Sequence, residues 1–86
     1  MDAYVLTAVL YFDEEDYQTA RHHLLLGNKV SNASSSEVLY FLGYANMKLG
    51  EVAEAKKYAQ AAAKLGYPLS GLMKKIEELE KIRSSE

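Results

Sequence analysis

Two runs of apolar residues at helical spacing, divided by one glycine, constrain the fold of this chain most strongly. Both lie in the stretch SEVLYFLGYANMKLGEVAEAKKYAQAAAKLGYPL at 36–69. Apolar residues that recur at i, i+3, i+4 and i+7 indicate amphipathic helices. Gly50 stands between the runs, where a helix end favours a residue that accepts positive φ. Because the small residues Gly43, Ala55 and Ala62 let two helices approach closely, the stretch predicts an αα-hairpin.

A weaker copy of the same pattern lies 35 residues earlier in the chain. With this offset Ala20 aligns with Ala55, and residue size agrees at most positions where packing demands it. Few residues are identical between the two halves, so the comparison depends on the similar size of the aligned residues. The copy predicts a first helix over 1–12 and a second helix from about residue 16, joined by the acidic run at 13–16.

The second hairpin resembles the tetratricopeptide repeat, a helix–turn–helix unit of about 34 residues. The resemblance implies an all-α fold, an α-solenoid whose helical hairpins form a right-handed superhelical stack with a concave groove. It implies five helices in a single domain over 1–86, with a degenerate first repeat at 1–34, a second repeat at 36–69 and a capping helix at 70–84. The residues that carry the resemblance are Leu42-Gly43, Leu49-Gly50, Ala55, Ala62 and Pro68.

The connecting segments carry their own start and stop signals. Ser34, followed three residues later by Glu37, predicts a capping box at the start of the third helix. Gly66 and Pro68 predict the end of the fourth helix. A fifth helix is expected from about residue 69 to residue 83, where charged residues cover an apolar stripe. The last element of a repeat stack needs such a polar outer face.

Composition excludes several classes of partner and site. The 12 acidic and 10 basic residues are mixed and give a net charge of −2, so no basic face indicates a nucleic-acid partner. Without cysteine there is no disulfide framework and no thiolate metal site. No apolar run reaches the roughly 18 residues that a membrane span needs. Since no signal-peptide pattern is present either, we expect a cytoplasmic protein.

Candidates for catalysis or metal binding are few. His22 and His23 are adjacent, so on a helix their side chains point about 100° apart and cannot both ligate one ion. The sequence contains no HExxH, P-loop or GxGxxG motif. We therefore expect no enzyme activity and no cofactor or metal.

One face of the first helix of each unit lines the groove, if the resemblance holds. Tyr40 and Tyr44 lie one turn apart, about 100° around the third helix from its core stripe. An aromatic stripe outside the core costs solubility unless something covers it. The resemblance implies that the groove binds a peptide or an amphipathic helix of a partner protein, as in a scaffold, assembly factor or small chaperone. The residues assigned to the groove are Val5, Val9, Phe12, Tyr40, Tyr44, Met47 and Lys48.

Other arrangements would also bury this stripe. The fifth helix could fold back over it, or two copies of the chain could pack it together as a homodimer. The chain could also be a fragment of a longer repeat array whose other repeats cover the apolar face. In these alternatives the domain is a structural self-association module. Tyr4, Tyr11 and Tyr17, by contrast, are expected in the core, because they fall on repeat positions normally filled by bulky core side chains.

Overall fold

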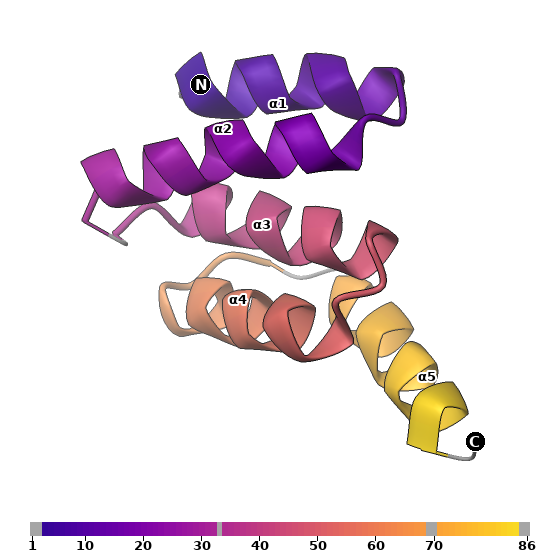
Figure 1. Ribbon diagram of the computed structural model, residues 1–86. Coiled ribbons are helices and arrows are strands. Elements are labelled where there is room, and N and C mark those ends of the chain that lie inside the picture. Colours follow the sequence, from indigo (N-terminus) through magenta and orange to yellow (C-terminus); the bar gives the residue numbers. More distant parts are fainter. Residues whose placement is uncertain (1–2, 33, 69–70, 85–86) are drawn as a thin grey trace.

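The computed structural model describes residues 3–32, 34–68 and 71–84, and this part of the chain is all-helical. Four helices lie one above another, and the fifth leaves the stack at an angle (Figure 1). This confirms the all-α fold class and its stack of helical hairpins. The helices are α1 (Ala3–Asp13), α2 (Tyr17–Val30), α3 (Ser36–Lys48), α4 (Val52–Lys64) and α5 (Leu72–Ser84).

The α1–α2 and α3–α4 hairpins close with the same turn, 35 residues apart. In the first, the Asp16 backbone N–H donates to the Tyr11 carbonyl at 2.9 Å; in the second, Glu51 donates to Asn46 at 2.9 Å. The middle residue of each turn is left-handed, Glu15 with φ 60° and Gly50 with φ 81°. The offset expected from residue size is therefore present in the backbone itself.

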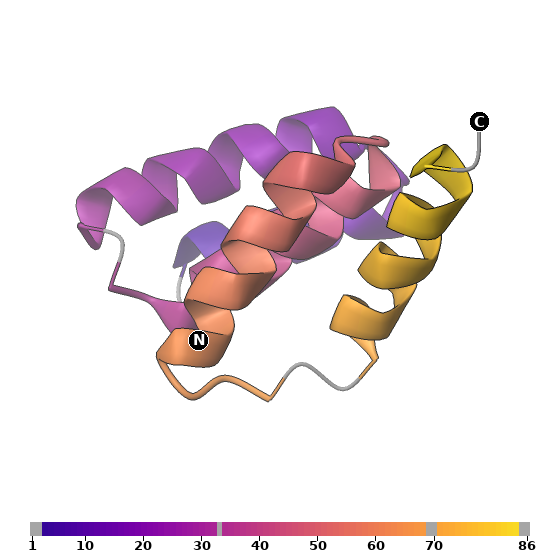
Figure 2. The ribbon, with the colours of Figure 1, turned by 90° about the horizontal axis from the view of Figure 1, so that it is seen from below.

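Helix α3 is the centre of the molecule, because both hydrophobic clusters include it. The first cluster joins α3 to α1 and α2 through buried residues such as Val5, Leu24 and Leu42. The second joins α3 to α4 and α5 and contains Ala59 and Ile76. Figure 2 shows the same arrangement from below, with α4 and α5 leaning apart.

Glycines allow the closest approaches inside each hairpin. A Cβ added to Gly27 of α2 would lie 2.8 Å from the Cβ of Tyr4 in α1, and one added to Gly43 would lie 3.3 Å from the Ala55 carbonyl oxygen. Gly43 and Ala55 thus let α3 and α4 pack closely, as the sequence predicts.

Three helix boundaries differ from the sequence predictions. The N-cap of α3 is Ser35, whose hydroxyl accepts from the Val38 N–H at 3.3 Å, so the expected capping box at Ser34 is wrong. The run rich in Ser and Asn at 28–35 predicts a loop. Helix α2 nevertheless continues to Val30, because the left-handed turn comes only at Asn32 (φ 59°). Helix α5 begins at Leu72, and the expected starts at 69 and 70 lie outside the described residues.

Helix α5 docks on α4 through positions that match those by which α3 docks on α2, although α5 is tilted out of the stack (Figure 1). Leu72 and Ile76 are buried at positions 34 residues after the buried Val38 and Leu42. A polar pair accompanies each interface. The Arg21 Nη1 of α2 donates to the Asn46 Oδ1 of α3 at 2.9 Å, and the Lys56 Nζ of α4 lies 3.2 Å from the Glu80 Oε1 of α5. Helix α5 is therefore placed like the first helix of a third unit.

Candidate partner-binding site

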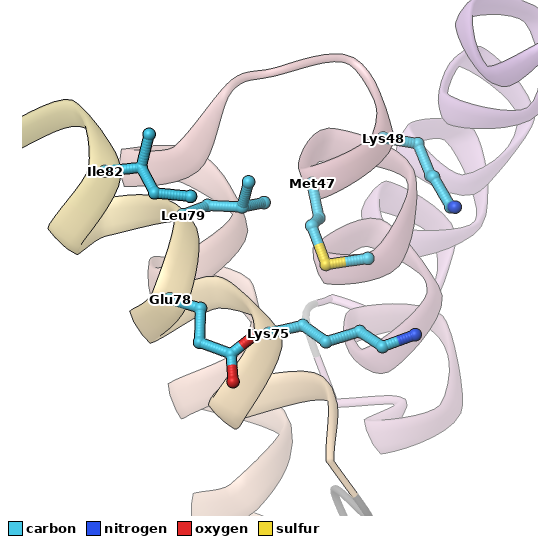
Figure 3. A pocket seen from close by; sticks show the side chains of 6 residues that line it. All are labelled: Met47, Lys48, Lys75, Glu78, Leu79 and Ile82. Carbon is cyan, nitrogen blue, oxygen red and sulfur yellow. The ribbon is translucent and has the colours of Figure 1, made fainter.

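A hollow with a volume of about 400 Å³ lies between the end of α3 and the outer half of α5. Figure 3 shows Leu79 of α5 pointing toward Met47 of α3, with Ile82 further along α5, while Lys75 extends across toward α3. Apolar side chains thus face one another across the hollow and charged side chains stand at its edges. The lining residues are Met47, Lys48, Lys75, Glu78, Leu79 and Ile82.

A second hollow of about 120 Å³ adjoins the first along α3. The two share Met47 and Lys75, so they form one continuous surface, which we call the α3–α5 groove. Tyr40 and Tyr44 supply its α3 side, and Gly71 and Leu72 supply its α5 side.

An aromatic cluster supports the α3 wall of the groove. The Tyr44 ring meets Phe12 edge-on with 5.2 Å between ring centroids, and it lies 6.4 Å from Tyr17. The Lys48 Nζ lies 5.7 Å from the Tyr44 ring centroid, which is within cation–π range. Tyr44 is therefore packed against three neighbouring side chains.

The other end of the wall is closed by the segment after α4. The Tyr67 ring packs on Tyr40 with 4.7 Å between centroids. Burial raises the pKa of Tyr67 above its ordinary value of 10.0, and the nearby Glu37 and Tyr40 raise this pKa further. The neutral phenol is thus the form that the packed structure favours.

The structure separates the groove residues assigned from sequence into two groups. Tyr40 and Tyr44 are half-buried on the groove wall, Met47 is 7% exposed at its base, and Lys48 is exposed at its edge. These four come together with α5. The remaining three, Val5, Val9 and Phe12, line neither hollow of the groove.

The assignment of Val5 to an open groove is wrong. Val5 is 0% exposed and belongs to a buried cluster with Leu24 of α2 and Leu42 of α3. Because α3 packs against α1 as well as α2, the side of α1 that carries Val5 is enclosed. Val9 and Phe12 are half-buried and pack against the same cluster.

Sequence reasoning missed the α5 wall of the groove, which includes Lys75, Glu78, Leu79 and Ile82. The sequence predicts α5 as a cap or as a cover over the tyrosines, although its apolar stripe is longer than docking on α4 requires. Leu72 and Ile76 are buried, whereas Ile82, two turns further on, is 58% exposed. The extra length of this apolar stripe was the signal in the sequence from which the second wall of the groove could have been predicted. The alternative in which α5 covers the tyrosines holds in part, because Tyr40 and Tyr44 pack against the cluster that contains Leu72 and Ile76 of α5.

The three tyrosines expected in the core are half-buried instead. Tyr17 belongs to the aromatic cluster of the groove wall, and Tyr11 stacks on His23 with 5.5 Å between ring centroids. His22 is exposed on the neighbouring face. Tyr4 packs over Gly27.

Within the described residues, no three His, Cys, Asp or Glu side chains are grouped to hold a metal ion. No helix in that part combines the length and apolarity that crossing a bilayer needs. Comparisons with protein-family models, with curated proteins and with solved structures found no match to this chain. The tetratricopeptide resemblance therefore stays a prediction.

Proposed function

We propose that this chain is a non-enzymatic protein-interaction module of the tetratricopeptide type, acting in the cytoplasm, and that the α3–α5 groove binds an apolar segment of a partner protein. The observation that carries the proposal is the continuity of the two hollows through Met47 and Lys75. A helix docked only to close a stack has no need of a second, open apolar wall. Here Leu79 and Ile82 provide one.

The lining indicates what such a segment should contain. An apolar side chain would fit between Met47 and Leu79, where it is removed from water. The charged residues of the lining are two lysines, Lys48 and Lys75, and one carboxylate, Glu78, so the lining has an excess of positive charge. We therefore expect a peptide or amphipathic helix with apolar residues flanked by Asp or Glu.

Two properties suit the groove to binding. Tyrosine offers a large apolar area with a polar hydroxyl and few rotamers to freeze, and it is a common binding anchor. Tyr44 is held by Phe12, Tyr17 and Lys48, so little side-chain entropy is left to lose.

The proposal is tested with peptides selected by display on the immobilised full chain. A selected peptide is synthesised, and its Kd is measured by fluorescence anisotropy. Ile82→Glu and Lys75→Glu should each weaken binding about tenfold, since each changes a groove wall. Leu65→Glu is the matched control, because Leu65 is 51% exposed and lines neither hollow.

Selected peptides should be enriched in apolar residues next to carboxylates. Peptides that bind the two groove variants as tightly as the original chain would contradict the proposal, and so would a selection that yields no specific binder.

Self-association through Tyr44, the alternative from the sequence, remains a separate prediction. Sedimentation should then show a dimer that Tyr44→Glu abolishes. The packing of Tyr44 between Phe12 and Tyr17 does not favour this alternative, because it hides part of the ring inside the monomer.

A further inference from the structure

The two ends of the helix stack differ in polarity. At the α5 end, exposed charged residues such as Lys74, Glu77 and Lys81 face outward. At the α1 end, the outer face carries Leu6 at 52% exposure and Leu10 at 66% exposure. Since the terminal elements of a repeat stack need a polar outer face, the α5 end is capped, whereas the α1 end presents leucines to water.

The internal repeat shows what kind of surface this outer face is. On α3, Val38, Leu42 and Ala45 are fully buried in one cluster with the α2 residues Ala20 and Leu24. This is the face with which α3 receives the preceding helix. Thirty-five positions earlier, α1 carries Ala3, Thr7 and Leu10.

A hollow of about 290 Å³ lies at this position of α1, lined by Thr7, Leu10, Tyr11 and Glu14. Where α3 holds α2, the matching face of α1 is thus open within the described part of the chain. The surface has the position, the apolar residues and the concavity of a helix-receiving face.

The polar pairs of the two inner interfaces indicate the charge of a matching helix. Each incoming helix has a basic residue directly after a buried alanine, Arg21 after Ala20 and Lys56 after Ala55. Each basic residue donates to an oxygen of the receiving helix, on Asn46 and on Glu80.

On α1, three side chains of the hollow carry an oxygen, Thr7, Tyr11 and Glu14, and of these three Glu14 is the charged one. The Glu14 carboxylate forms no ion pair with any described residue. Asp13 and Glu15, on either side of it, are exposed and add to the negative charge. The site is therefore complementary to a cation.

We infer that the outer face of α1 binds an amphipathic helix of a partner protein, antiparallel to α1, with a Lys or Arg placed against Glu14. The incoming helix should follow the pattern that α2 and α4 share. Counted from Ala20 in α2 or from Ala55 in α4, small or apolar residues stand at the first, fifth and eighth positions, and a basic residue stands at the second. This site lies on the opposite side of α1 from Val5 and is separate from the α3–α5 groove.

The test uses the full chain and a synthetic, end-capped, fluorescent peptide that copies residues 51–66. This peptide carries the α4 pattern and is rich in alanine, which favours the helical state. Binding is followed by anisotropy. Leu10→Glu in the chain should weaken binding at least about tenfold. Leu65→Glu, at another exposed leucine on a different part of the stack, should leave binding unchanged.

A charge exchange identifies the pairing. Glu14→Lys in the chain, or Lys56→Glu in the peptide, should each weaken binding about threefold, and the two together should restore it. Because Leu10 and Glu14 are exposed, both variants should melt close to the original chain. Melting curves check this.

Three results would overturn the inference. The first is the absence of saturation up to about 1 mM peptide. The second is binding that Leu10→Glu does not change, which would place the peptide elsewhere. The third is sedimentation of the chain alone as a dimer that Leu10→Glu dissociates, because the face would then belong to a second copy.

Discussion

Single residues with special backbone or packing requirements explain how two dissimilar halves form the same hairpin. Glu15 adopts the left-handed conformation that Gly50 adopts in the second turn. Gly27 and Gly43 each remove a side chain where a neighbouring helix passes closely. At this scale, what repeats along the chain is backbone geometry, with little identity of side chains.

Glu15→Gly should stabilise the chain. A residue with a Cβ costs about 1–2 kcal/mol at a left-handed position, and the extra freedom of glycine in the unfolded state returns part of that. We expect a net gain of about 0.5–1 kcal/mol in the free energy of unfolding, measured from the urea midpoint. The control Gln18→Gly, at an exposed position in the first turn of α2, should instead lose stability, by less than about 1 kcal/mol. A lower free energy of unfolding for Glu15→Gly would show that this turn does not have the described geometry.

Gly27→Ala should destabilise the chain, although alanine is the better helix former. The new Cβ would lie 2.8 Å from the Cβ of Tyr4, so α1 and α2 must move apart. Overpacking of this kind costs about 1–3 kcal/mol, and helix propensity returns up to about 1 kcal/mol. Thermal melts should show a net loss of about 1 kcal/mol. Lys29→Ala, on an exposed face of the same helix, should have nearly the same stability as the original chain. Equal melts for the two variants would contradict the close approach.

Tyr67 should make the chain less stable in alkali. Its pKa is raised in the folded state, mainly by burial, so the unfolded chain loses this proton at lower pH than the folded one. The stabilisation is therefore complete below pH 10 and decreases as the pH rises above that value. Tyr67→Phe keeps the ring on Tyr40 and removes the ionisation. Its melting temperature should fall less between about pH 9 and pH 11 than that of the original chain. If the melting temperatures of the two proteins fell equally with pH, the raised pKa of Tyr67 in the folded state would be contradicted.

At the scale of the helices, α3 is central and α5 has two roles. The buried residues of α3 belong to both clusters, so α3 orients the first hairpin and α5 together. The inner half of α5 docks through Leu72 and Ile76, while its outer half provides Leu79 and Ile82 to the groove. Docking and the proposed binding thus involve successive turns of one helix.

Ile76→Ala should therefore loosen α5 and its wall of the groove. The residue is 0% exposed, and the substitution should cost about 2–4 kcal/mol. Hydrogen exchange should show faster exchange in α5, with α1 and α2 still protected. Ile82→Ala, at a 58% exposed position of the same helix, should change stability by less than about 0.5 kcal/mol. Uniform loss of protection along the whole chain would show that α5 is not a separate unit.

At the scale of the whole molecule, patterns along the chain predicted the hairpins but not how the helices share their faces. The 35-residue offset, the turn glycine and the apolar stripes are local, so they could be identified in the sequence. The burial of Val5 could not, because it depends on α3 packing against both helices of the first hairpin. The tilt of α5 also follows from tertiary docking, so its contribution to the groove was missed. The handedness of the stack stays a prediction.

The central claim is that the α3–α5 groove is the binding surface, and methyl NMR tests it most directly. A chain labelled at the methyl groups of Met, Ile and Leu is titrated with a display-selected peptide. The account predicts saturable shifts at Met47, Leu79 and Ile82, with Leu6 and Leu65 unmoved. Shifts confined to residues outside the two hollows, or no shifts at saturating peptide, would contradict it.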